Sequence, residues 1–234
     1  MYRQNPEHMN REIIYKDLGL IPYAEAWDLQ EDLFQAIIHT KNDPGQEKAP
    51  NYLLFCEHPH VYTIGKSGSD NNLLINENTL SSKGATFFRT NRGGDITYHG
   101  PGQIVGYPIL DLESFDLGIR RYIEILEESV IRLLRDYGIH SSRLEGASGV
   151  WLDTDDPLKA RKICAIGVRS SRFVTMHGFA FNVNTDLEFY KHINPCGFTD
   201  KGVTSIETEL GLKQDIEKVK SDLKDILFSL LQQC

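Results

Sequence analysis

Two short stretches of this chain combine residue types that can do chemistry. One is the glycine-rich run Arg92-Gly-Gly-Asp-Ile-Thr-Tyr-His-Gly-Pro-Gly-Gln103, which can turn sharply and puts an arginine and a histidine beside the turn. The other is Ile193-Asn-Pro-Cys-Gly197, where proline and glycine favour a turn that presents Cys196. Between them lies Lys162, a cation at the head of an apolar run. A cysteine, a lysine and a glycine-lined cleft together indicate acyl transfer through a thioester.

Cys196 is the strongest candidate for a nucleophile among the four cysteines. An inert core cysteine is the alternative, because free cysteine is among the most buried residue types. A thiol at a turn can be exposed enough to react, and its thiolate fraction then depends on a nearby cation. Cys56 and Cys164 lie in apolar runs and Cys234 is the last residue, so these three are weaker candidates.

Lys162 could supply that cation. Side chains alternate between the two faces of a strand, so we expect Lys162 to share a face with Cys164 and Ile166. A lysine drawn inward at this position would have a lowered pKa, because desolvation disfavours the ammonium. The alternative is an ordinary solvated lysine at the end of a strand.

The glycine-rich run also has a purely structural alternative, a hairpin with tight turns in which Tyr98 and His99 are simply packed. The run is not a phosphate loop, since it lacks the G-x-x-x-x-G-K-[ST] pattern. It is not a dinucleotide fingerprint either, because no helix follows it at once.

A metal site is a further possibility, because Cys56, His58 and His60 would share one face of an extended strand. Pro59 interrupts that strand, and no fourth ligand has a signature spacing. We therefore expect neither a metal nor a cofactor.

The spacing of apolar residues predicts the elements that position these groups. Steps of three and four residues predict helices over 23–40, 119–137 and 216–230. Short apolar runs predict strands over 12–18, 51–56, 61–65, 86–90, 96–99, 104–112, 149–152, 162–169 and 174–183. Helices alternate irregularly with runs of strands, which predicts an α+β (mixed α/β) fold with a central mixed sheet covered by helices.

The composition limits the class of protein. The length of 234 residues fits one domain, which we assign to residues 11–234 after a flexible tail over 1–10. A net charge of −8 disfavours nucleic-acid binding, which needs a basic face. No apolar run approaches the length of a membrane span, and the first residues lack a hydrophobic signal core. These features predict a cytoplasmic protein that binds neither nucleic acid nor membrane.

Six motifs occur in a fixed order between Leu53 and Leu210. They are Glu57-His-Pro-His-Val-Tyr-Thr-Ile-Gly65, the Arg92–Gln103 run with Tyr107-Pro108, Gly149-Val-Trp151, Lys162-Ile-Cys-Ala-Ile-Gly-Val168, His177-Gly-Phe-Ala-Phe-Asn182 and Asn194-Pro-Cys-Gly197. Any one of them is a weak signal. In this order they resemble the lipoyl(octanoyl) transferase family, also called octanoyl-[acyl carrier protein]:protein N-octanoyltransferases.

The resemblance implies the fold of biotin and lipoate protein ligases. It also implies that Cys196 is the acyl-thioester nucleophile and that Lys162 tunes it. The residues that it implies for the acyl tunnel are Arg92, Gly93, Gly94, Asp95, Ile96, Thr97, Tyr98, His99, Ala165, Ile166, Gly167, Gly178, Phe179 and Ala180. One departure is Cys164, where the resemblance leads us to expect a small alanine.

The activity implied by the resemblance is the first step of protein lipoylation. The donor would be octanoyl-acyl carrier protein, and the acceptors would be lysine amines of the lipoyl domains of 2-oxoacid dehydrogenases and of the glycine cleavage H protein. Two alternatives remain, an ATP-dependent lipoate-protein ligase on the same fold and a non-catalytic module that binds acyl carriers or lipoyl domains. Neither alternative needs a reactive thiol, so the reactivity of Cys196 separates them from acyl transfer.

Overall fold

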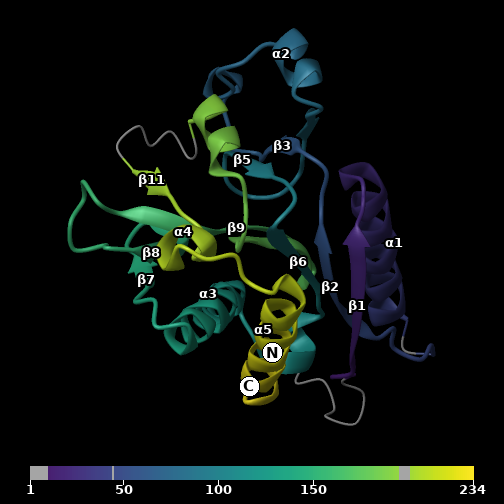
Figure 1. Cartoon of the computed structure of the whole chain (residues 1–234). Coiled ribbons are helices and arrows are strands. Elements are labelled where there is room, and N and C mark those ends of the chain that lie inside the picture. Colours follow the sequence, from purple (N-terminus) through teal and green to yellow (C-terminus); the bar gives the residue numbers. More distant parts are fainter. Residues whose placement is uncertain (1–9, 44, 195–200) are drawn as a thin grey trace.

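A computed structural model describes residues 10–43, 45–194 and 201–234 of the chain (Figure 1). The strands are β1 (Ile13–Leu20), β2 (Asn51–Glu57), β3 (Val61–Ile64), β4 (Thr86–Arg89), β5 (Ile96–His99), β6 (Gln103–Ile109), β7 (Ser142–Leu144), β8 (Ala147–Leu152), β9 (Arg161–Ser171), β10 (Val174–Asn182) and β11 (Gly202–Val203). The α-helices are α1 (Tyr23–Asn42), α2 (Glu77–Ser82), α3 (Ile119–Asp136), α4 (Ile206–Leu210) and α5 (Ile216–Gln232). The 3-10 helices are η2 (Asp70–Asn72), η3 (Leu112–Phe115) and η4 (Leu187–His192). The predicted α+β class is confirmed.

The strands form one large sheet and one small one. The large sheet has the order β1-β2-β6-β10-β9-β8-β7, with β11 paired to β9, and the small sheet has the order β4-β3-β5. Both sheets are mixed, because β1 and β2, β11 and β9, and β3 and β4 pair in parallel while the other pairs are antiparallel. The long antiparallel pair β9 and β10 runs through the middle of the large sheet.

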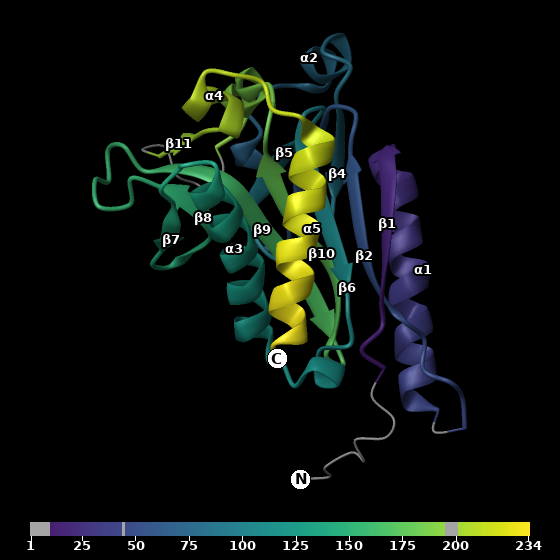
Figure 2. The ribbon, with the colours of Figure 1, turned by 60° about the horizontal axis from the view of Figure 1, so that its bottom comes forward.

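Helices α3 and α5 lie side by side over one face of the large sheet (Figures 1 and 2). Their apolar stripes, which include Leu126, Val130, Leu223 and Leu227, are buried against Phe181 and other residues of β9 and β10. Helix α3 is followed by Gly138, which has φ +74 in the left-handed region that commonly ends a helix. These contacts form the main hydrophobic core.

Helix α1 covers part of the opposite face. Its buried Ala26, Phe34 and Ile37 pack on Val105 of β6 and Met176 of β10. The polar residue that interrupts this apolar stripe, Gln30, is fully buried.

One residue of the predicted tail lies within the described structure. Asn10 belongs to the described structure, where Asn51 Nδ2 donates to its carbonyl at 2.8 Å and its own Nδ2 donates to Lys48 O at 3.2 Å. Residues 1–9 lie outside the described residues. None of the described helices is both long and apolar enough to cross a bilayer.

Candidate active site

A cavity of about 310 Å³ lies between the large sheet and the segment that includes β5. Its floor is made of small residues on the two central strands. Ala165 pairs with Ala180 across β9 and β10, and Gly167 pairs with Gly178. Because four neighbouring positions carry a methyl group or no side chain, the floor is a trough that an extended apolar chain can enter.

The glycine-rich turn forms the roof of this trough and packs closely on the protein's own backbone. Gly93 N donates to Val168 O on β9 at 2.9 Å. A Cβ on Gly65 would lie 2.3 Å from Gly94 O, and one on Gly167 would lie 2.8 Å from Gly93 O. Gly94 also has φ +84, which favours glycine. The glycines therefore allow the turn to pack closely against the floor of the trough. This role is separate from any contact that they make with a ligand.

Arg92 holds the roof in place. Its side chain is buried, and Nη2 donates to Thr63 O at 2.6 Å and to Thr63 Oγ1 at 2.9 Å. Nη1 donates to Gly93 O at 2.9 Å. The guanidinium thus ties the turn to strand β3 and places a positive charge at the cavity wall.

His99 continues this hydrogen-bonded network. Its Nδ1 lies 2.9 Å from Gln103 Oε1 and its Nε2 lies 3.3 Å from Thr63 Oγ1. Since Gln103 Oε1 can only accept, Nδ1 carries the proton and Nε2 accepts from the threonine hydroxyl. Burial holds the pKa of His99 well below its usual range, so the imidazole is neutral. Gln103 Nε2 in turn donates to Asn182 Oδ1 at 2.9 Å and to Tyr190 OH at 3.1 Å.

Lys162 lies in the wall at one end of the trough, and a β-bulge puts it there. On β8 and β9, Val150 pairs with Cys164 but the next residue, Trp151, pairs with Lys162. Ile163 is therefore an extra residue on β9, and an extra residue reverses the alternation of faces. The Lys162 ammonium lies 4.6 Å from the centroid of the Trp151 ring, which also lines the cavity.

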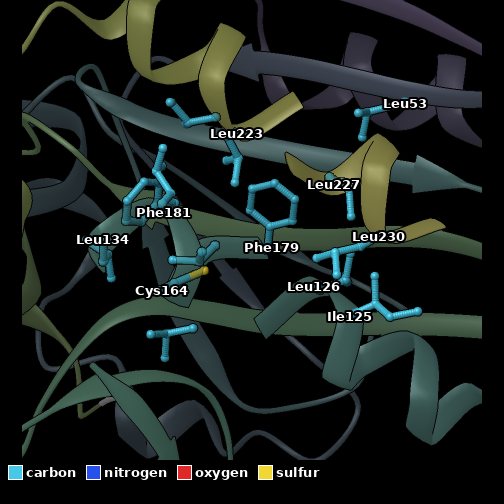
Figure 3. Packing of buried hydrophobic residues seen from close by; sticks show 14 of the residues in the cluster. Leu53, Ile125, Leu126, Leu134, Cys164, Phe179, Phe181, Leu223, Leu227 and Leu230 are labelled. Atoms are coloured by element: carbon cyan, nitrogen blue, oxygen red, sulfur yellow. The ribbon is translucent and has the colours of Figure 1, made fainter. Parts of the chain in front are cut away.

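The prediction that Lys162 shares a face with Cys164 is wrong for this reason. Cys164 is buried on the opposite side of the sheet, among Phe179, Phe181 and Leu126 (Figure 3). Burial raises the pKa of its thiol far above the usual value. Cys164 is therefore a core residue, and the lysine faces the trough without it.

The other described cysteines are also poor nucleophiles. Cys56 is fully buried, its Sγ lies 3.5 Å from His58 Nε2, and burial raises the pKa of its thiol. Cys234 follows α5, and its thiol donates to Leu230 O on that helix. Neither cysteine lines the cavity.

Cys196 lies outside the described residues, but the chain on both sides of residues 195–200 is fixed by contacts with described residues. Before them, Asn194 N donates to Asn72 O at 2.9 Å, and Ile193 forms a bridge with Leu73. After them, β11 pairs in parallel with Arg161 and Lys162, and residues 201–203 line the cavity beside Lys162. The described chain thus resumes against the strand that carries Lys162.

The three residues considered as metal ligands do not form a ligand set, although Cys56 lies beside His58. His58 Nδ1 donates to Ile21 O at 2.7 Å, and its Nε2 accepts from Tyr107 OH at 2.7 Å. His60 instead stacks on Phe189, with ring centroids 4.0 Å apart. Among the described residues no three His, Cys, Asp or Glu side chains are grouped so as to hold a metal ion.

Most of the residues that the resemblance implies for the tunnel do line the cavity. Those that do are Arg92, Gly94, Asp95, Ile96, Thr97, His99, Ala165, Ile166, Gly167, Gly178, Phe179 and Ala180, together with Lys162. Gly93 and Tyr98 do not line it, since Gly93 bonds to β9 and the Tyr98 hydroxyl lies 2.7 Å from His60 Nδ1. Cavity residues that the sequence did not assign to the tunnel include Tyr23, Val105, Tyr107, Trp151, His177, Asn182, Tyr190 and Lys201. Val105 and Tyr107 are two residues apart on β6, so they share one face of that strand.

Comparison with known proteins decides the family. The family model for the lipoyl protein ligase A/B catalytic domain matches residues 22–228. The chain belongs to this family. It is 58% identical to an octanoyltransferase from Parabacteroides distasonis over 92% of this chain and 97% of that protein. It is 55% identical to an octanoyltransferase from Bacteroides fragilis over 94% of this chain and 99% of that protein.

Solved structures confirm the predicted fold. The chain superposes on a bipartite lipoate protein ligase from Thermoplasma acidophilum with a TM-score of 0.66 and 17% identity, over 96% of this chain and 85% of that chain. It superposes on a lipoate-protein ligase A bound with ATP with a TM-score of 0.65 and 16% identity, over 96% and 86% of the two chains. At these identities the likeness establishes the lipoate protein ligase fold.

Proposed function

We propose that this protein transfers an octanoyl group from octanoyl-acyl carrier protein to a lysine amine of lipoyl domains, through a thioester on Cys196. The observation that carries the proposal is the small-residue trough with Lys162 at one end, in a chain that is more than half identical to octanoyltransferases. The acceptors are the lipoyl domains of 2-oxoacid dehydrogenases and of the glycine cleavage H protein.

The trough suits the acyl tail. Its floor of alanine and glycine and the neighbouring Val105 and Ile96 offer an apolar surface. Burying each methylene of an octanoyl chain contributes about 0.8 kcal/mol, so six methylenes contribute about 5 kcal/mol. This binding energy holds the reacting carbonyl at the Lys162 end of the cavity.

In the first step the Cys196 thiolate attacks the thioester carbonyl of the donor. The new bond joins Cys196 Sγ to the acyl carbon, and the bond from that carbon to the phosphopantetheine sulfur breaks. The ammonium of Lys162 favours the thiolate before attack and then gives its proton to the departing thiol.

In the second step the amine of the acceptor lysine attacks the acyl-cysteine. Lys162, now neutral, takes the proton of the amine as general base. The amide bond forms and the bond from Cys196 Sγ to the acyl carbon breaks. A thioester is converted to an amide, which is downhill, so the reaction needs no nucleotide. Cys196 is assigned to this role because the described cysteines are buried or lie away from the cavity.

Reconstitution tests the proposal. Purified protein, octanoyl-acyl carrier protein and an apo lipoyl domain should give the octanoyl amide without ATP and with a chelator present. Kinetics should be ping-pong, because the carrier leaves before the amine attacks. The Lys162→Met variant should lose transfer, whereas Lys159→Met should keep it, because Lys159 is an exposed residue paired with Asp156.

Two results contradict the proposal. If product appears only from free octanoate or lipoate with ATP and Mg²⁺, the protein is an ATP-dependent ligase. If the protein binds donor and acceptor but forms no product under either condition, it is a binding module.

A further inference from the structure

The end of the trough opposite Lys162 is formed by His177. Strand β10 runs along the floor, with Asn182 near the Lys162 end and His177 five residues before it. Asn182 Nδ2 donates to Thr204 O at 3.0 Å, and Thr204 N donates to Lys162 O at 2.9 Å, which fixes that end. A strand rises about 3.3 Å per residue, so the α-carbons of Asn182 and His177 lie about 16 Å apart.

His177 reaches the cavity because its backbone departs from the strand. It has φ +58, in the left-handed region that is unfavourable for a residue with a Cβ. Met176 packs under α1 and Phe179 packs in the core on the other face, so regular alternation would send His177 into that core. The ring instead lines the cavity, with its centroid 6.1 Å from that of Trp27 on α1.

One hydrogen bond holds the imidazole of His177 in this position, and another holds its backbone. Its Nε2 lies 2.6 Å from Asn91 Oδ1, in the segment that leads into the glycine-rich turn. The backbone N of His177 donates to Gln30 Oε1 at 3.0 Å. Among the described atoms, His177 Nδ1 and Gln30 Nε2 are both buried without a hydrogen-bond partner.

This arrangement lowers stability, since a strained backbone and unpartnered buried polar atoms are both unfavourable. Such features persist where the position of a side chain matters for function. His177 lies at the end of the trough opposite Lys162. On its Lys162 side lie Gly178 and Ala180, and on its other side Met176 packs with Phe34 in the cluster under α1.

We propose that His177 sets the length of the acyl chain that the cavity accepts, by closing the inner end of the trough. The inference rests on the proposed function, which places the reacting carbonyl at the Lys162 end. With carbon–carbon bonds of about 1.52 Å and angles near 111°, an extended chain advances about 1.25 Å per bond, so eight carbons span about 9 Å. This is about 7 Å less than the separation of the Asn182 and His177 α-carbons, which leaves room for side chains at the two ends.

Acyl transfer from carriers loaded with six to fourteen carbons tests the proposal. His177→Gly removes the ring and also accepts φ +58 without strain, so the protein should fold. His177→Asn is a second variant, because asparagine tolerates the left-handed region and is shorter than histidine. Each variant should raise the ratio of kcat/KM for the twelve-carbon donor to that for the eight-carbon donor at least tenfold over wild type, with the glycine variant showing the larger change.

Arg172→Gly is the matched control. Arg172 is exposed in the hairpin before β10 and has φ 51, so its replacement by glycine relieves similar strain without touching the cavity. Its chain-length ratio should equal that of wild type. An unchanged ratio in both folded His177 variants overturns the inference. If wild type itself transfers none of the acyl groups, the proposed function has failed instead.

Discussion

Replacing Arg92 by methionine should loosen the roof of the trough. The buried guanidinium donates to the carbonyl oxygens of Thr63 and Gly93, at 2.6 and 2.9 Å. Methionine fills part of the space but donates no hydrogen bond. Both carbonyls then lose a charged donor, and the turn loses its connection to strand β3.

The magnitude follows from these two hydrogen bonds. A hydrogen bond to a charged group contributes about 1.5–3 kcal/mol, so Arg92→Met should lower the free energy of unfolding by about 3–6 kcal/mol. For a chain of this size 1 kcal/mol shifts Tm by about 2–4 °C, which predicts a fall of roughly 6–24 °C. Arg92→Lys should lie between wild type and Arg92→Met, since an ammonium cannot reproduce the geometry of the guanidinium fork.

Thermal unfolding followed by circular dichroism measures the effect. Arg89→Met is the control, because Arg89 forms an exposed ion pair with Asp70 and its loss should change Tm little. If Arg92→Met unfolds at the same temperature as Arg89→Met, the guanidinium does not hold the roof and the account of the turn is wrong.

Three further predictions follow from the site. Lys162→Met should slow alkylation of Cys196 near neutral pH, because without the ammonium the pKa of the thiol returns toward its free value of about 8.5. If alkylation has the same pH profile in wild type and in Lys162→Met, the lysine does not play this role. Cys164→Ala should keep octanoyl transfer. It should lower the free energy of unfolding by only about 1 kcal/mol, because it removes little volume from the core. A loss of transfer would contradict the assignment of Cys164 to the core. Burial holds the pKa of His58 at about 4 and that of His177 at about 3, so below pH 6.5 the unfolded chain takes up protons that the folded protein does not. Stability should therefore fall by about 1.4 kcal/mol per pH unit for each histidine from pH 6.5 down toward pH 4, and equal urea midpoints at pH 7 and pH 5 would contradict this.

Periodicity predicts the long elements of this chain but not its short ones. The helices α1, α3 and α5 begin and end within about two residues of the predicted limits, because each has an apolar stripe several turns long. The short helix α2 and the strand β7 were not predicted. A single helical turn or a strand of three residues shows too few repeats to reveal a period.

The motifs of the resemblance predict the floor of the site, whereas alternation of faces wrongly places Lys162 beside Cys164. Ala165, Gly167 and Ala180 line the trough, in keeping with the tunnel that the motifs imply. Lys162 reaches the cavity because a bulge reverses the alternation, and His177 reaches it because its own left-handed backbone turns that one side chain to the other face. Neither feature is visible in a pattern of apolar residues. A bulge and a positive φ belong to the geometry of the backbone, and the residue types along the strand do not reveal them.

The most direct test of the central claim is the intact mass of the wild-type protein after incubation with octanoyl-acyl carrier protein and no acceptor, followed by peptide mapping. The account predicts one added octanoyl group, located on Cys196, that disappears when an apo lipoyl domain is added and that does not form in Cys196→Ala. An octanoyl group on Cys164, or transfer by a wild-type protein that never carries one, would contradict it.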